Sequence, residues 1–340
     1  VADVEMRRVM EKFGKVIVKL RIPILILSFL LLIPSAIGYF NTRVNYDILY
    51  YLPNEIETMQ GQDILMDDFN KGAYAMVVVQ NMDTKSTDRL IKKVENVDHV
   101  AQVISYTGIV GEDVPSEIVP SKFRKYFEND STDTTLFAIF FDNTTSSDDT
   151  MNAIIQIREQ TEGQAFISGM SAVVTDTKNL SEKETPLYVL IAVVLVCIVL
   201  AIFMDSFLVP VFFMISIGMA IVYNLGSNIL LGEVSYITKA LAAVLQLGVT
   251  LDYSIFLWHS YKEMKEIYPD DHKEAMAVAI SNTLTSVVGS SITTVAGFIA
   301  LCFMSFTLGL DLGIVMAKGV VFGVIGCVTI LPSLILTFDR

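Results

Sequence analysis

The sequence predicts a polytopic α-helical membrane protein that carries one folded α+β domain outside the membrane. Hydrophobic residues make up 53% of the 340 residues and the mean hydropathy is +0.55, values that are rare in soluble proteins. The apolar residues fall in runs long enough to span a bilayer, and one polar, acidic stretch covers residues 41–185. These observations predict six transmembrane helices, with the polar domain between the first and the second.

The first span is expected over Ile22–Phe40, directly after a basic segment. Residues 1–40 therefore comprise a cytoplasmic basic segment and transmembrane helix 1. Basic residues are retained on the cytoplasmic side of a membrane, so the N-terminus is expected inside and residues 41–185 outside the cell membrane.

The domain over residues 41–185 shows the pattern of a ferredoxin-like α+β fold. Short β-prone runs alternate with amphipathic stretches in the order β-α-β-β-α-β, which is the split βαβ arrangement. A short additional helix is expected near Glu117–Phe127, between the two middle strands. The expected strands are 73–80, 100–106, 136–142 and 165–168, and the expected helices are 86–97 and 148–161.

Residues 186–340 supply transmembrane helices 2–6. Asp205 and Ser206 are expected to form a short inner turn, and the C-terminus is expected in the cytoplasm. The segment of about 262–280 is polar and amphipathic, which predicts a separate helix lying on the cytoplasmic face. The five expected spans are Pro186–Met204, Phe207–Leu225, Tyr236–Trp258, Thr283–Met304 and Gly313–Leu336.

One acidic residue, Asp252, interrupts the fourth predicted span, about 9 Å from its inner end at helical rise. A carboxylate at that depth costs roughly 2.5–3.5 kcal/mol on insertion scales, so such residues usually serve ion or proton movement. Tyr253 could donate a hydrogen bond to it, and Gly248 would let another helix approach the same face. The alternative is a buried structural acid paired with a neighbouring helix.

The fifth and sixth predicted spans offer supporting residues. Ser286, Ser290 and Thr293 share one helical face with Thr294 beside it, which suits either proton-path hydrogen bonding or close helix packing. Lys318 in the sixth span could join a proton path or extend to the membrane interface. The glycines of this span predict a helix-contact seam, and Asp311 is expected outside the hydrocarbon. The seam comprises Gly319, Gly323 and Gly326.

Several other chemistries are disfavoured by the sequence. It contains no P-loop for ATP, no metal-spaced His/Cys set, and no basic patch for nucleic acid. Neither a cofactor nor a metal ion is therefore expected. A secondary active transporter accounts for these features better than an enzyme does.

The motif GVTLDYSIFL at residues 248–257 resembles the fourth-span Gly-xxx-Asp-Tyr motif of the resistance-nodulation-division (RND) superfamily, specifically its MMPL-type exporters. The hydroxyl-rich run SVVGSSITTVAGF at 286–298 also fits, and the resemblance covers nearly the whole chain. It implies that Asp252 and Tyr253 belong to a proton relay. It further implies that proton flow drives export of lipids or other hydrophobic compounds through an outer porter domain.

Members of this superfamily contain two six-span halves, so the resemblance implies that this chain acts as one half. The second half could be a continuation of the same chain, a second copy, or a different protein. Its other expected partners are membrane lipids and a hydrophobic substrate. Two alternatives share the same architecture: a SecD/SecF-like protein-export accessory, and a sterol- or lipid-sensing receptor unit.

Overall fold

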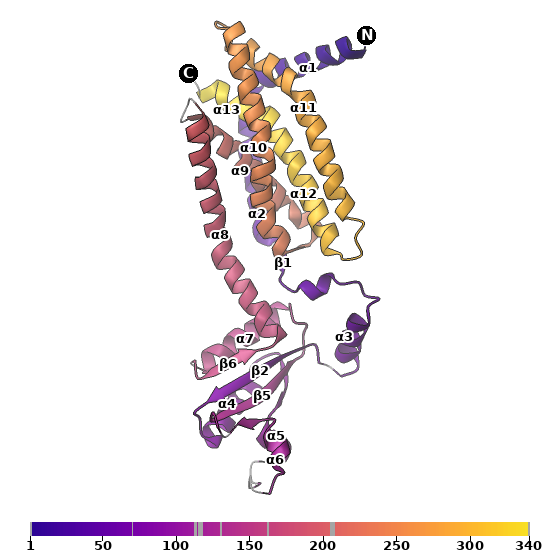
Figure 1. The fold of residues 1–340 in the computed structure, drawn as a ribbon, viewed down its shortest axis with the longest axis vertical. Helices are drawn as coiled ribbons and strands as arrows, with labels where there is room; N and C mark the ends of the chain where they lie inside the picture. The colour runs from indigo at the N-terminus through magenta and orange to yellow at the C-terminus, as the bar shows by residue number, and fades with distance from the viewer. Residues whose placement is uncertain are drawn as a thin grey trace. The chain divides into compact units, whose positions relative to one another are not determined.

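The computed structural model describes residues 2–69, 71–111, 114, 118–129, 131–161, 163–204 and 208–338. The chain divides into two compact units. The bundle unit contains Val1–Asn45 and Lys183–Arg340, and the sheet unit contains Tyr46–Glu182. The sheet unit is therefore an insertion between the first two long apolar helices (Figure 1).

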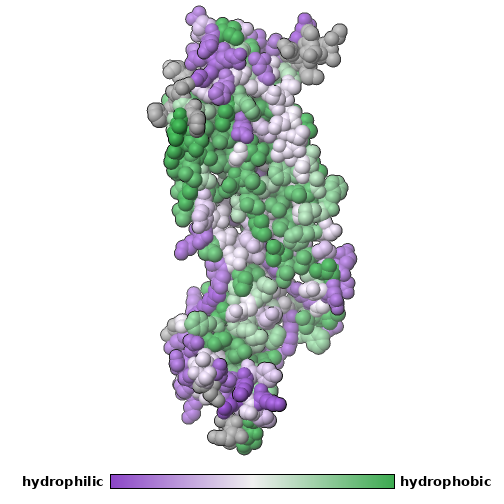
Figure 2. Space-filling model, viewed as in Figure 1, coloured by the Kyte–Doolittle hydropathy of each residue, from purple (hydrophilic) through white to green (hydrophobic). Residues whose placement is uncertain are grey.

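Six helices in the described part of the chain are long and apolar enough to cross a membrane. This number confirms the six-span prediction, and Figure 2 shows hydrophobic residues covering much of the visible surface of the bundle unit. A preceding helix, α1 (Ala2–Lys19), carries the basic residues. The six are α2 (Arg21–Asn41), α8 (Met170–Phe203), α9 (Leu208–Gly226), α10 (Tyr236–Ile267), α11 (His272–Leu301) and α12 (Leu308–Ile325), the last continued by η3 (Gly326–Ile330) and α13 (Leu331–Phe338).

The helices of the bundle unit differ strongly in how much of their surface is covered. About 67% of the apolar window of α12 with η3 and α13 is buried, whereas only 11% of the window of α11 is. The glycines of α12 allow this central position, because Gly319 packs against the side chain of Asn224 and Gly323 against that of Thr250. The predicted glycine seam is therefore present, whereas α11 keeps one side open.

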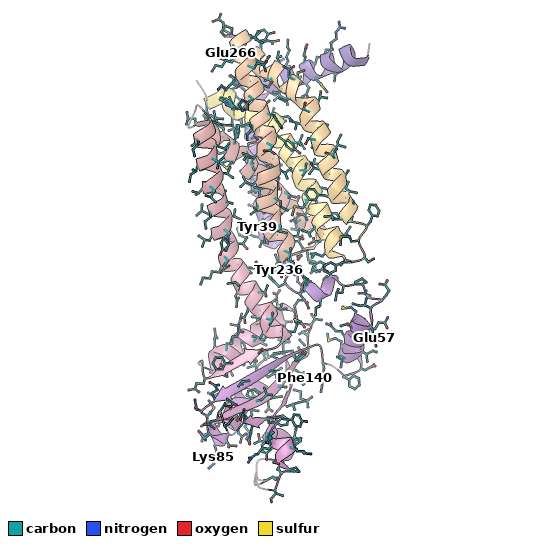
Figure 3. The ribbon with its side chains drawn as sticks, in the orientation of Figure 1. Tyr39, Glu57, Lys85, Phe140, Tyr236 and Glu266 are labelled. Carbon is teal, nitrogen blue, oxygen red and sulfur yellow. The ribbon has the colours of Figure 1, made fainter. Side chains whose placement is uncertain are left out.

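A short parallel pair of strands marks one end of the bundle unit. At one end, β1 (Arg43–Asn45), which follows α2, pairs in parallel with β7 (Glu233–Ser235), which precedes α10. Tyr39 and Tyr236 mark this end, and Glu266 marks the opposite end of α10 (Figure 3). Tyrosines commonly lie at membrane–water interfaces, so their position fits a membrane boundary at the β1–β7 end.

The prediction of a separate amphipathic helix over about 262–280 is wrong. α10 continues to Ile267, a short turn follows, and His272 begins α11. The Asp271 carboxylate ends the turn by accepting hydrogen bonds from the backbone N–H groups of Lys273 and Glu274, at 3.1 and 3.0 Å. The apolar face that suggested a membrane-surface helix is instead buried beneath α1, where Gly14 contacts the backbone of Ala277.

The sheet unit contains a mixed-length sheet in the order β3-β5-β2-β6, with all paired neighbours antiparallel. A short strand, β4 (Glu128–Asn129), also pairs with β5. Apart from the short elements α5, α6 and β4 between β3 and β5, the order along the chain is β2-α4-β3-β5-α7-β6, which is the predicted order of strands and helices. The bounds are β2 (Ala73–Gln80), α4 (Thr84–Glu95), β3 (Val100–Ile104), β5 (Thr134–Phe141), α7 (Asp148–Thr161) and β6 (Ala165–Ser168).

One face of this sheet forms the core of the sheet unit. Alternate residues of β2, such as Val77 and Val79, are buried with Phe137 and Ile139 of β5. The apolar faces of α4 and α7 cover them, including Val94. On the other face Tyr74, Met76 and Phe166 remain exposed.

Shorter elements fill the connections of the sheet unit. The helix expected near Glu117–Phe127 is present as α6, although Glu117 lies outside the described residues, as do Asp205 and Ser206 of the expected inner turn. The remaining elements of the chain are η1 (Ile48–Tyr51), α3 (Glu57–Asp67), α5 (Tyr106–Val110), α6 (Ser121–Arg124) and η2 (Ser227–Leu231).

Candidate functional site

Asp252 and Tyr253 are neighbours on α10 that point in different directions. Tyr253 is 3% exposed and packs in the largest hydrophobic core, whereas Asp252 is exposed on the outer side of the helix. Successive helical residues are rotated by about 100°, so one helix cannot direct both side chains to the same place. Within the described part of the chain, Asp252 has neither a hydrogen bond nor an ion pair.

The glycine one turn before Asp252 is also uncovered. A Cβ added at Gly248 would find no described heavy atom of a neighbouring element within 4 Å. The close helix approach that this glycine would permit is therefore not made by the described residues. Gly248 and Asp252 together form part of an open face on α10.

The hydroxyl residues of α11 are open in the same way. Ser286, Ser290 and Thr293 are exposed and Thr294 is partly buried, on a helix that packs against α10. The hydroxyls of Thr293 and Thr294 donate to the backbone carbonyl of Ser290, at 2.7 and 3.1 Å. These two hydroxyls are thus satisfied by their own helix rather than by Asp252.

We use the name open face for the uncovered residues of α10 and α11 that the sequence singled out. A lipid-exposed carboxylate is costly, and small residues such as glycine and serine favour close contact between transmembrane helices. The composition of the open face therefore suits another helix better than lipid. The open face comprises Gly248, Asp252, Ser286, Ser290 and Thr293.

Lys318 is engaged at another place in the bundle unit. Its ammonium group donates to the side-chain oxygen of Asn228 at 2.6 Å and to the backbone carbonyl of Asn224 at 3.1 Å. These contacts tie α12 to the end of α9 and to η2. The structure therefore does not bring Lys318 together with Asp252.

The sequence reasoning missed a polar seam inside the bundle unit. Gln246, Thr250 and Ser254 follow each other at intervals of four along α10, and all three are buried. The amide of Asn224 donates to Gln246 at 3.0 Å. This i, i+4, i+8 spacing of polar residues is present in the sequence and places the three side chains on one face of α10, roughly opposite Asp252.

Asp311, which the sequence placed outside the hydrocarbon without a role, makes two hydrogen bonds in the structure. Its carboxylate accepts from the Thr238 hydroxyl at 2.6 Å and from the Ser235 backbone N–H at 2.8 Å. It therefore joins the first turn of α12 to the first turn of α10, which is a structural task. In the described residues, no three His, Cys, Asp or Glu side chains lie close enough together to hold a metal ion.

Known proteins resemble this chain over most of its length. It is 24% identical over 356 residues to the membrane protein MJ1562 of Methanocaldococcus jannaschii, which covers 94% of this chain and 91% of that protein. It is 21% identical over 325 residues to the apo-petrobactin exporter of Bacillus anthracis, covering 91% of this chain and 42% of the exporter. The chain thus spans less than half the length of that exporter.

A solved structure shares the fold. SecDF, a translocon-associated membrane protein from Thermus thermophilus, superimposes with a TM-score of 0.50 at 14% sequence identity. The match covers 95% of this chain and 38% of SecDF, and at this identity it concerns the fold alone.

The sequence model of the MMPL family matches residues 51–340. These residues include most of the sheet unit and five of the six apolar helices. The chain therefore belongs to the MMPL family of membrane proteins.

Proposed function

We propose that this chain is one six-span half of a proton-driven exporter of lipids or other hydrophobic compounds. The observation that carries the proposal is Asp252, a carboxylate within an apolar helix that is exposed and has no partner in the described part of the chain. Intramembrane acids of this kind are usually retained for ion or proton movement. Membership of the MMPL family and similarity to an exporter support a transporter rather than an enzyme.

In this proposal Asp252 takes up and releases the proton, and Tyr253 holds the helix in register for it. Tyr253 follows Asp252 in the sequence and packs in the core. It therefore fixes the rotation of α10 about its axis and, with it, the direction of the Asp252 side chain. The hydroxyls of Ser286, Ser290 and Thr293 lie on the helix packed against α10. We propose these hydroxyls as the side chains that line a hydrated path to Asp252, because they are exposed on the neighbouring helix.

A second six-span half would cover the open face. Such a partner would remove Asp252 from lipid and place its own polar groups opposite the acid, which lowers the cost of the buried carboxylate. The partner could be a continuation of the same chain, a second copy of it, or another protein of the family. Each of these arrangements completes the relay in the same manner.

The sheet unit is proposed as a ferredoxin-like porter domain on the extracytoplasmic side of the cell membrane. The antiparallel order β3-β5-β2-β6 supports this assignment, and the basic residues of α1 support cytoplasmic termini through the positive-inside rule. The exposed Tyr74, Met76 and Phe166 on one sheet face suit contact with a hydrophobic substrate or a neighbouring domain.

The two alternatives remain weaker candidates. The similarity to SecDF is one of fold at 14% identity, so it does not favour a role in protein export. A lipid-sensing unit would change a partner's binding without net transport. An assay of transport therefore separates both alternatives from the exporter.

The test replaces Asp252 with Asn in the complete gene product and measures efflux of the lipophilic dye Nile red from energised cells. Asp252→Asn keeps the side-chain shape but cannot bind and release a proton, so efflux should fall to the level of cells without the protein. Glu263→Gln, at an exposed acid near the far end of α10, serves as the control for loss of an acid elsewhere in the bundle unit and should export the dye as the wild type does. If the Asp252→Asn variant exports the dye as the wild type does, the relay assignment is wrong.

A further inference from the structure

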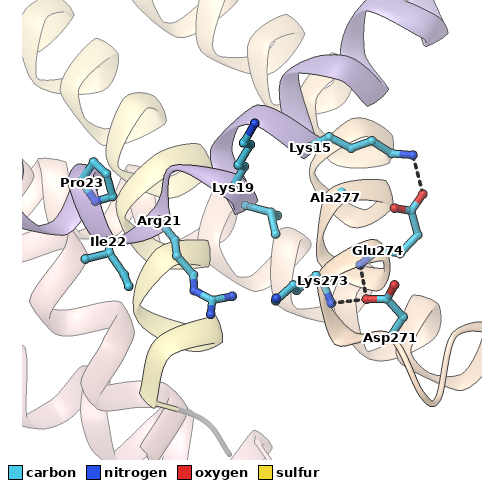
Figure 4. Close-up of a pocket in the computed structure, with 10 residues that line it drawn as sticks. Lys15, Lys19, Arg21, Ile22, Pro23, Asp271, Lys273, Glu274 and Ala277 are labelled. Carbon is cyan, nitrogen blue, oxygen red and sulfur yellow. Dashed lines mark hydrogen bonds and ion pairs between the residues drawn. The ribbon is translucent and has the colours of Figure 1, made fainter.

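A cavity of about 460 Å³ lies where the end of α1 and the start of α2 meet the start of α11 (Figure 4). Four basic side chains and two acidic ones line it, together with apolar residues that include Ile22. The charged residues are Lys15, Lys19, Arg21, Lys273, Asp271 and Glu274.

The two acids of this cavity are already engaged. Glu274 forms an ion pair with Lys15 at 2.8 Å, and this contact raises the pKa of Lys15 above its ordinary value. Asp271 accepts two backbone hydrogen bonds at the start of α11. The positive charges of the cavity therefore exceed the negative ones.

Three cations of the cavity have no ion pair with any described residue: Lys19, Arg21 and Lys273. Figure 4 shows Arg21 and Lys273 on opposite sides of the cavity, pointing toward each other. Two like charges directed into one space favour an anion between them. Arginine in particular presents a planar set of donors that matches a phosphate group.

An apolar groove continues from the same place along the outer surface of the bundle unit. It has a volume of about 560 Å³ and shares Ile22 with the basic cavity. The α2 residues that line it run from Ile22 to Ile33, a rise of about 16 Å, close to half of the ~30 Å hydrocarbon core of a bilayer. The groove is lined by Ile22, Leu25, Ile26, Phe29, Leu30, Ile33, Thr337 and Phe338.

We propose that the basic cavity and the apolar groove form one binding site for an anionic phospholipid. The phosphate lies between Arg21 and Lys273, and one acyl chain follows the groove of α2 across its own leaflet. A free phosphate would use only the basic cavity, and a zwitterionic lipid would use chiefly the groove. The combination of the two specifies a lipid with net negative charge. This site is separate from the open face and does not depend on transport.

The experiment measures binding of dioleoyl phosphatidylglycerol to the purified full chain by native mass spectrometry. Dioleoyl phosphatidylcholine tests the headgroup charge with the same chains, and glycerol 3-phosphate tests the headgroup without chains. The wild type should retain phosphatidylglycerol in preference to the other two probes. The Arg21→Gln/Lys273→Gln variant should lose about 30-fold in affinity for it, the effect of two basic residues near a lipid surface.

The matched control is Arg8→Gln/Lys12→Gln. It also removes one arginine and one lysine, both from α1 and outside the cavity, and it should bind the lipid as the wild type does. If the first double variant does not fold, Lys273→Gln alone replaces it, because Lys273 is exposed and loses no ion pair. Equal retention of both lipids, or unchanged binding by the Arg21/Lys273 variant, would overturn the proposal. Binding of glycerol 3-phosphate as tight as that of the lipid would also overturn it, in favour of a free-phosphate site.

Discussion

At the scale of single residues, the structure separates the polar groups of the bundle unit into an inner and an outer set. Asn224, Gln246 and Thr250 face the interior, whereas Asp252 faces outward from the same region of α10. The Oδ1 atom of Asn224 and the Nε2 atom of Gln246 are buried without a hydrogen-bond partner among the described residues. Unsatisfied groups of this kind cost about 1–3 kcal/mol each, so an ordered water is expected to bridge them.

Lys318 is a residue whose role can be decided by substitution. Lys318→Met removes two hydrogen bonds and leaves the Oδ1 atom of Asn228, a residue only 1% exposed, without this donor. The loss in free energy of unfolding should be about 1.5–3 kcal/mol, the usual range for hydrogen bonds from a charged group. Thermal unfolding in detergent measures this effect, with Lys273→Met, at an exposed lysine without an ion pair to any described residue, as the control. An unchanged unfolding temperature combined with lost proton coupling would instead place Lys318 in the relay.

Asp83 shows how a surface carboxylate stabilises a helix of the sheet unit. It is the N-cap of α4 and accepts from the Ser86 backbone N–H at 3.2 Å, and hydrogen bonds from Ser86 lower its pKa from 3.8. An acid with a lowered pKa contributes stability above its unfolded pKa and loses it as the pH falls through the lowered folded value.

Asp83→Ala should therefore increase hydrogen exchange of the α4 amides in the whole protein at pH 7. The difference from the wild type should stay constant above about pH 5 and shrink as the pH falls below 3.8, after correction for intrinsic exchange rates. Asp83→Asn keeps a capping oxygen and should retain most of the protection. A difference that is independent of pH would contradict the capping role of the charged form.

At the scale of elements, one helix crossing depends on two glycines. Gly38 of α2 and Gly226 of α9 let the two backbones touch, and a Cβ on Gly226 would clash with the carbonyl group of Ser35. Backbone atoms cannot move aside as a flexible side chain can. The crossing therefore tolerates no side chain at either position.

Gly226→Ala should lower the free energy of unfolding by about 1–3 kcal/mol, the usual cost of overpacking. Gly218→Ala on the same helix is the matched control, because a Cβ there has no described atom of a neighbouring element within 4 Å. It should leave stability unchanged or raise it slightly. Thermal unfolding of the three proteins in one detergent compares them, and equal values for both variants would refute the tight crossing.

The sequence predicted most elements because their patterns have one physical explanation. Long apolar runs form spans, and the alternation of β2 places Val77 and Val79 in a core. The prediction for 262–280 failed because an amphipathic helix has the same sequence pattern whether its apolar face lies on a membrane surface or under a neighbouring helix. The contact of Ala277 with Gly14 joins positions far apart in the chain, so no local pattern reveals it.

The candidate site was predictable in its residues but not in its geometry. The cost of a carboxylate in an apolar run singled out Asp252 from sequence alone. Its direction depends on which face of α10 packs inward, and that choice is set by Leu257, Tyr253 and other core residues acting together. The same limit explains why the sequence pattern allowed a relay role for Lys318, although its ammonium group bonds to Asn224 of α9 and Asn228 of η2.

At the scale of the whole molecule, the open face predicts a separation between folding and transport. Gly248→Leu adds a side chain where the described chain has open space, so the unfolding temperature should remain unchanged. Export of Nile red should fall strongly, because the leucine occupies the surface that the second half would cover. Gly218→Leu, at another open glycine, is the control for the added volume. Normal export by the Gly248→Leu variant would show that no partner packs on the open face.

The most direct test of the proton relay follows protons rather than substrate. The complete gene product is reconstituted in liposomes with pyranine inside and an imposed pH gradient, and Nile red is added. The wild type should dissipate the gradient faster in the presence of the dye, Asp252→Glu should retain part of this flux, and Asp252→Asn should show none. A proton flux in Asp252→Asn equal to that of the wild type would contradict the assignment of Asp252 as the proton carrier.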